Sequence, residues 1–166
     1  MNKVKAFAGV LLLLLLFPLS ACQGRSHPMA HLTGELHFRA HLSLAGESYL
    51  ADISLSAMTG ESRDATVTVL SPSTIAGVVY KKEGGKITAS LDGATVELAH
   101  GDLFSFLELF HITLPLTETK SGNGERIYVF SDKESRHTVT VKDGATLPTH
   151  IVRESPEGVH SIELLP

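Results

Sequence analysis

Nine histidines are the residues of this 166-residue chain best suited to metal binding or acid–base chemistry. His37 and His41 lie four residues apart in a stretch that alternates like a β-strand, so their side chains would share one face. At about 3.3 Å per residue their β-carbons would lie about 13 Å apart, too far to bind one ion together. Arg39 lies between them, and its charge disfavours a cation there. We interpret the pair as part of a solvated polar face and predict no metal site.

The sequence contains none of the common catalytic motifs. It has no G-x-S-x-G elbow, no S-x-x-K pair, no phosphate-binding P-loop, no G-x-G-x-x-G and no H-E-x-x-H. His100 and Asp102 flank the start of an apolar segment, where capping of a helix is the ordinary role of such residues. We therefore predict no catalytic residue, no cofactor and a protein that is not an enzyme.

The single cysteine, Cys22, follows an N-terminal segment that is typical of secretory signals. Residues 2–5 are basic, and residues 6–17 are apolar and include six consecutive leucines. An uncleaved membrane anchor is the alternative, but the apolar run is short for a spanning helix, which takes about 20 residues. A lone thiol cannot form an internal disulfide, so Cys22 has no stapling role.

Residues 19–22, L-S-A-C, closely resemble the lipobox of bacterial lipoproteins. In that class the peptide is cleaved before the cysteine, whose sulfur and new amino group are acylated. The resemblance implies a signal peptide at residues 1–21, lipidation of Cys22, and a lipid anchor on the extracytoplasmic side of the plasma membrane, or in an outer membrane if the cell has one. Each buried CH₂ contributes about 0.8 kcal/mol, so two or three acyl chains would hold the protein firmly. Residues 22–31 would then be the acylated cysteine and tether, and residues 32–166 a single domain.

The charge balance disfavours nucleic acid as a partner. The net charge is −4 with histidine neutral, and removal of residues 1–21 would take away two further lysines. We find no basic stripe along the sequence. A hydrophobic content of 43% fits a globular domain and argues against disorder.

Alternation with a period of two predicts that most of residues 32–166 is β-structure. In residues 35–44, apolar side chains such as Phe38 and Leu42 alternate with polar ones. Turn signals such as Asp92-Gly93 and Asp143-Gly144 separate about ten short strands. Parallel pairing would need helical crossovers, and the sequence offers one real helix, so we expect an antiparallel meander.

That helix is predicted in residues 100–115, H-G-D-L-F-S-F-L-E-L-F-H-I-T-L-P. Ser105, Glu108 and His111 interrupt its apolar residues at intervals of three, which places them on one narrow stripe. Asp102 is the expected N-cap, and Pro115 the expected stop. A helix that is apolar over most of its circumference must be covered on nearly every side. We therefore predict a mainly β (α+β) fold, a curved antiparallel sheet whose concave face this helix covers.

Several segments resemble the LolA/LolB/LppX-like family of bacterial lipoproteins. They are the Ser-Pro turn at residues 71–72 with the strand that follows it, the strands near residues 127–130 and 137–141, and the Leu-Pro loop at residues 147–148. The resemblance spans most of residues 35–165. It implies an open half-barrel of antiparallel strands with helical cover on its concave face, and the binding or carriage of a lipid or a lipidated protein.

Two functions remain open at this stage. The first is non-catalytic binding of a hydrophobic ligand by a membrane-anchored lipoprotein, in a cavity between sheet and helix. The second is an envelope adaptor with a filled core, which docks a protein partner through an exposed apolar patch or a free sheet edge. For the first function, the expected ligand-binding residues lie on the helix and on the strand opposite it: Phe38, Leu42, Phe104, Phe106, Leu107 and Phe110.

Overall fold

The computed structural model describes residues 28–166. The predicted signal peptide and Cys22 lie outside the described residues, and the boundary of the tether stays a prediction. The chain divides into two units, Met1–Ala30 and His31–Pro166, and the fold belongs to the second. A short 3₁₀ helix, η2 (Ala30–Thr33), precedes the sheet.

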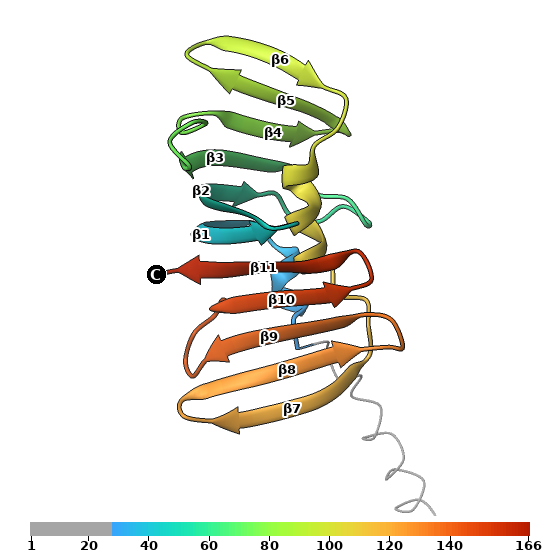
Figure 1. The fold of residues 1–166 in the computed structure, drawn as a ribbon. Helices are drawn as coiled ribbons and strands as arrows, with labels where there is room; N and C mark the ends of the chain where they lie inside the picture. The colour runs from blue at the N-terminus through green and yellow to red at the C-terminus, as the bar shows by residue number, and fades with distance from the viewer. Residues whose placement is uncertain (1–27) are drawn as a thin grey trace, which may run out of the picture. The chain divides into compact units, whose positions relative to one another are not determined.

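One antiparallel sheet of eleven strands makes up most of the second unit (Figure 1). Its spatial order is β6-β5-β4-β3-β2-β1-β11-β10-β9-β8-β7, which is two meanders joined where the first strand pairs with the last. The prediction of an antiparallel meander is confirmed. The strands are β1 (Leu36–Leu44), β2 (Glu47–Leu55), β3 (Ala65–Ser71), β4 (Val79–Glu83), β5 (Lys86–Leu91), β6 (Ala94–Leu98), β7 (Leu116–Gly122), β8 (Glu125–Ser131), β9 (Arg136–Lys142), β10 (His150–Ser155) and β11 (Gly158–Leu165).

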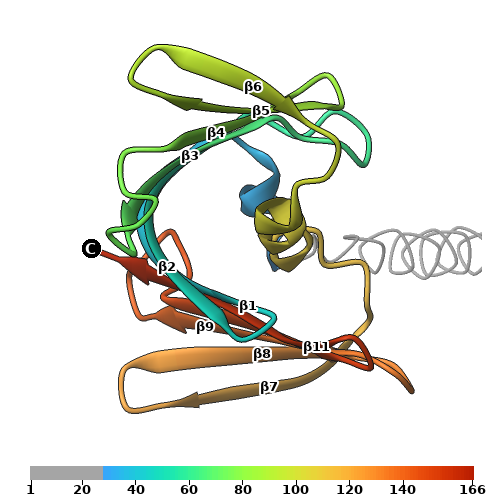
Figure 2. The ribbon, with the colours of Figure 1, turned by 45° about the horizontal axis from the view of Figure 1, so that its top comes forward.

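The helix η3 (Asp102–Leu109) lies in the concavity of this curved sheet (Figure 2). Its position follows from the topology, because η3 connects β6 to β7, and these are the two edge strands. The chain must therefore cross the whole sheet between them, and it does so on the concave side. The predicted open half-barrel with one covering helix is confirmed.

The type and the ends of this helix differ from the prediction. It is a 3₁₀ helix that begins after Gly101, with Asp102 as its first residue rather than its N-cap, and it ends at Leu109, well before Pro115. The amide of Phe110 donates to the Leu107 carbonyl at 3.1 Å, three residues earlier. With three residues per turn, side chains spaced by three lie directly above one another. The polar row at positions 105, 108 and 111 fits that repeat.

The strand registers identify which side chains face the concavity. Directly opposed residues of antiparallel strands point to the same side of the sheet. One row of direct partners crosses β1 to β6: Phe38, Ile53, Val67, Tyr80, Ala89 and Val96. The Phe38 ring lies 5.6 Å from that of Phe110, which follows η3, so this row lies on the concave face. His37 and Arg39, which alternate with Phe38, are exposed on the convex face.

Among residues 28–166, no helix is long and apolar enough to cross a membrane.

Candidate functional site

The six predicted ligand-binding residues lie on the concave face of β1 and on η3 and the residue after it. The Phe106 and Phe110 rings meet edge to face with centroids 6.5 Å apart, and the Phe104 and Phe106 centroids are 6.4 Å apart. Leu42, Phe104, Phe106 and Phe110 are buried, whereas Phe38 and Leu107 are half-buried. The centre of the half-barrel is therefore filled largely by the side chains of η3.

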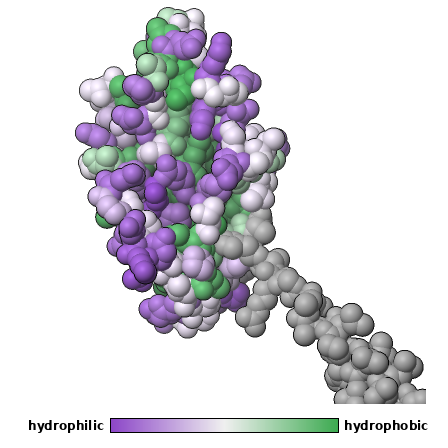
Figure 3. Space-filling model, turned by 90° about the vertical axis from the view of Figure 1, so that its right-hand side faces the viewer, coloured by the Kyte–Doolittle hydropathy of each residue, from purple (hydrophilic) through white to green (hydrophobic). Residues whose placement is uncertain are grey.

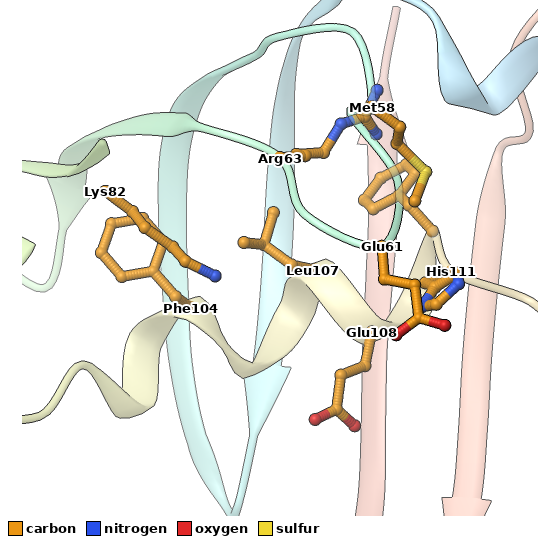
Figure 4. A pocket seen from close by; sticks show the side chains of 9 residues that line it. Met58, Glu61, Arg63, Lys82, Phe104, Leu107, Glu108 and His111 are labelled. Carbon is orange, nitrogen blue, oxygen red and sulfur yellow. The ribbon is translucent and has the colours of Figure 1, made fainter. Parts of the chain in front are cut away.

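A small cavity lies beside η3, under the loop between β2 and β3 (Figure 4). Its volume is about 180 Å³. An apolar cavity of roughly 150 Å³ can hold a benzene-sized molecule, so this cavity is too small for a whole lipid. Leu107 lies in the middle of the view, between Lys82 and Phe104 on one side and Glu61 and His111 on the other. The lining residues are Met58, Glu61, Arg63, Lys82, Phe104, Leu107, Glu108, Phe110 and His111.

A second, open hollow of about 720 Å³ lies where β1 begins and β11 ends. Phe38 lines it together with Leu147 and Pro148 of the Leu-Pro loop. Its volume falls within the usual range for ligand pockets, about 300–1,000 Å³. Charged residues, including Arg39 and Lys142, share the lining, so the hollow is amphipathic.

The concave face of β4 to β6 is largely apolar and exposed, with Lys82 of β4, the direct partner of Ile87, as its charged residue. Val96 is 57% exposed and Leu91 45% exposed. Ala89 and Ile87 face the same way, because they alternate with the residues that point to the convex side. Figure 3 looks onto the side where the half-barrel opens and shows a hydrophobic band in its upper part, flanked by hydrophilic residues. An exposed apolar surface of this kind is a candidate for contact with a ligand or a protein.

The concave face of β9 to β11 carries a polar row instead. His160, Arg153 and His137 are direct partners on β11, β10 and β9. Arg153 forms an ion pair with Glu108 of η3. His137 is buried, and burial lowers its pKa below the usual value for histidine, which favours the neutral ring. The sequence analysis missed this row, although the alternation of residues 137–141 placed His137 on the same face as Val139.

Arg63, in the loop between β2 and β3, is a buried cation. Its Nε donates to the Ser56 carbonyl at 2.8 Å, and its Nη2 donates to the Gly34 carbonyl. Nη1 has no hydrogen-bond partner among the described residues. Burial lowers the pKa of Arg63. No sequence pattern distinguishes this arginine from an exposed loop residue.

The histidines that drew attention in the sequence lie apart from this concave site. His37 and His41 are exposed on the convex face, and the His37 ring is hydrogen-bonded to Ser54 at 2.9 Å. Arg39, between them, holds both carboxylate oxygens of Asp52, at 2.7 and 2.9 Å. Within residues 28–166, no group of three or more histidine, cysteine, aspartate or glutamate side chains is placed to hold a metal ion.

An open antiparallel half-barrel crossed by a helix on its concave side is the class of fold that the sequence resemblance implies. Comparison with solved structures finds several similar chains. The chain is similar to the lipoprotein LppX of Mycobacterium tuberculosis at 13% identity and a TM-score of 0.43, over 82% of this chain and 91% of that one. It is also similar to a LolA-superfamily protein of Nitrosomonas europaea, at 11% identity and a TM-score of 0.41, over 81% and 85%.

A third similar structure is a putative outer membrane lipoprotein-sorting protein domain of Vibrio parahaemolyticus, at 10% identity and a TM-score of 0.42, over 80% of this chain and 84% of that one. No protein-family model matches the chain, and no curated protein is significantly similar to it.

Proposed function

We propose that this protein binds or carries a hydrophobic ligand, a lipid or the acyl chain of a lipidated protein, on the concave face of the half-barrel, without catalysis. The observation that supports this most strongly is the exposed apolar face of β4 to β6, which η3 leaves uncovered. Removing apolar surface from water contributes roughly 25 cal/mol per Å². An acyl chain that covers the concave face of β4 to β6 would be stabilised by this burial of apolar surface, and the sheet would not have to change.

The six candidate residues take different parts in this proposal. Leu107 and Phe38 are half-buried, so a ligand can contact them at the edge of η3 as the structure stands. Phe104 and Phe110 line the cavity of about 180 Å³, which could take the end of a chain. Leu42 and Phe106 are fully buried and would touch a ligand only if η3 moved.

We also propose that the protein acts at a membrane surface in the cell envelope. The support is the lipobox-like sequence at residues 19–22, which would lipidate Cys22. The residues that follow it would form the tether. An anchor at the start of the chain would keep the half-barrel close to its source of acyl chains.

Two valines provide a matched test of the ligand face. Val96 and Val159 are both strand residues and both 57% exposed. Val96 lies on the concave face, whereas Val159 is opposed to Glu154 and points to the convex side. Native mass spectrometry of protein purified without detergent, followed by lipid extraction, should detect a co-purifying lipid in the wild type. Val96→Lys should reduce the bound fraction at least about tenfold, because it buries a charge under the ligand. Val159→Lys should leave it unchanged.

A wild-type protein that carries no lipid, and takes up none when lipid is added, would overturn this proposal. It would favour the second candidate function, an adaptor that docks a protein. Two observations support that alternative: the core under η3 is filled, and β6 and β7 are edge strands of the sheet. Equal losses in the two lysine variants would also count against the concave face as the site.

A further inference from the structure

The polar row on β9 to β11 has no part in binding an acyl chain. Arg153 and His137 each lie two residues along their strand from a fully buried residue of the concave side, Ile151 and Val139. Their side chains therefore point into the half-barrel rather than to solvent. Charged and titratable residues are seldom buried without a partner or a ligand.

His137 is the member of this row whose hydrogen-bonding groups lack partners within the part of the chain that the structure describes. It is 4% exposed, and neither of its ring nitrogens has a hydrogen-bond partner among the described residues. A neutral imidazole offers one donor and one acceptor, and a protonated one offers two donors. A buried ring with both positions unmet is unfavourable. A polar group of a ligand would relieve that once the ring turned toward the concavity, because both nitrogens are covered as the structure stands.

Arg153 supplies a charge beside this ring. Its guanidinium pairs with Glu108, whose own side chain is well exposed on η3. A guanidinium has five N–H donors in a planar fork and can bind two acceptor oxygens at once. Because Glu108 is exposed, its carboxylate can turn to solvent when another anion takes its place.

An open hollow of about 370 Å³ joins these groups. His111, Thr113, Leu114 and Ser135 complete its lining. The charged and titratable side chains that face it are Arg153, Glu108, His111 and His137, so Arg153 is the fixed positive charge in this set. The lining is polar, in contrast to the apolar face of β4 to β6.

We propose that this hollow binds the anionic headgroup of an amphiphile, a carboxylate or a phosphate monoester, with Arg153 and His137 as its donors and in place of Glu108. The inference rests on the proposed function, because it assigns a headgroup site to a ligand whose chain lies on the same concave face. A nearby anion favours the protonated imidazole, which then donates from its ring nitrogens. The charged end of the amphiphile would lie at β9 and β10, and its apolar chain would extend toward the concave face of β4 to β6.

Three ligands with the same oleoyl chain test this inference: oleate, 1-oleoyl lysophosphatidic acid and methyl oleate. Their dissociation constants would be measured below the micelle concentration by displacement of an uncharged fluorescent acyl probe. The two anions should bind about tenfold more tightly than methyl oleate, as charge-assisted hydrogen bonds warrant. Arg153→Gln and His137→Phe should each abolish that preference and change the affinity for methyl oleate less than about twofold. Arg39→Gln, which removes an ion-paired arginine from the convex face, should leave the preference intact.

Each other result has a definite meaning. Equal wild-type affinities for all three ligands would overturn the headgroup site and leave the proposed function standing. No binding of any ligand, methyl oleate included, would overturn the proposed function and this inference with it. A preference that survives both concave-face variants, in protein whose circular dichroism is unchanged, would assign the anion to another site. Competition by inorganic phosphate or acetate at the concentration of the lipid would show a free-anion site and contradict an amphiphile.

Discussion

Replacing Phe106 with alanine should lower the free energy of unfolding by about 3–5 kcal/mol. The Phe106 side chain is fully buried at the centre of the concave face. Its ring contacts those of Phe104 and Phe110. Truncation would remove these contacts and leave a cavity between η3 and the sheet, and the surrounding side chains could fill it only in part.

Urea denaturation followed by circular dichroism would measure this loss. Leu91→Ala is the control, because Leu91 is 45% exposed and its truncation should cost less than about 1 kcal/mol. A Phe106→Ala protein within about 1 kcal/mol of the wild type would mean that η3 contributes little to the core. That result would contradict the conclusion that the side chains of η3 fill the centre of the half-barrel.

Replacing Arg63 with alanine should cost about 2–4 kcal/mol, the second largest effect that we expect. Arg63 donates hydrogen bonds to the carbonyls of Ser56 and Gly34, and so joins the β2–β3 loop to the segment before β1. The amide of Met58 in the same loop donates to the Thr33 carbonyl at 2.8 Å. Loss of the guanidinium would leave two carbonyls without this donor. Relief of its burial would offset part of the cost.

The same denaturation experiment distinguishes a structural arginine from a dispensable one. Arg136 on β9 is exposed, so Arg136→Ala should leave the unfolding midpoint within error of the wild type. If Arg63→Ala also leaves the midpoint unchanged, the loop is held by its backbone contacts alone. Arg63 would then have its main role in the lining of the neighbouring cavity rather than in stability.

Much of the fold could be predicted from local patterns. The alternation around Phe38 and Leu42 predicted β1 and its buried face, and the glycine turns predicted the hairpins. Pairing of β1 with β11 is a contact between the two ends of the domain, and no local pattern encodes it. The repeat of three in the polar residues of η3 was visible, but it was interpreted as a stripe on an α-helix. The structure has a 3₁₀ helix instead, with Gly101 as its N-cap and Asp102 as its first residue, and it ends at Leu109.

The site could be predicted only in part, for a similar reason. Aromatic composition identified the cluster around Phe106, because apolar side chains that close together must be buried. The exposure of Val96 depends on how far η3 reaches along the sheet, and that depends on the tertiary structure. The approach of Arg153 to Glu108 joins β10 to η3 across the concavity. An arginine on a strand and a glutamate on a helix are both common, so nothing in the sequence indicated that Arg153 pairs with Glu108.

Photochemical cross-linking with a fatty acid that carries a diazirine on its chain tests most directly whether the concave face binds a hydrophobic ligand. The protein would be irradiated with the probe, digested and mapped by mass spectrometry. The account predicts adducts concentrated on residues 87–98 and on η3, and their loss when unlabelled oleate is added in excess. Adducts spread equally over convex residues such as Val159, or no adducts above those on the unfolded protein, would contradict it.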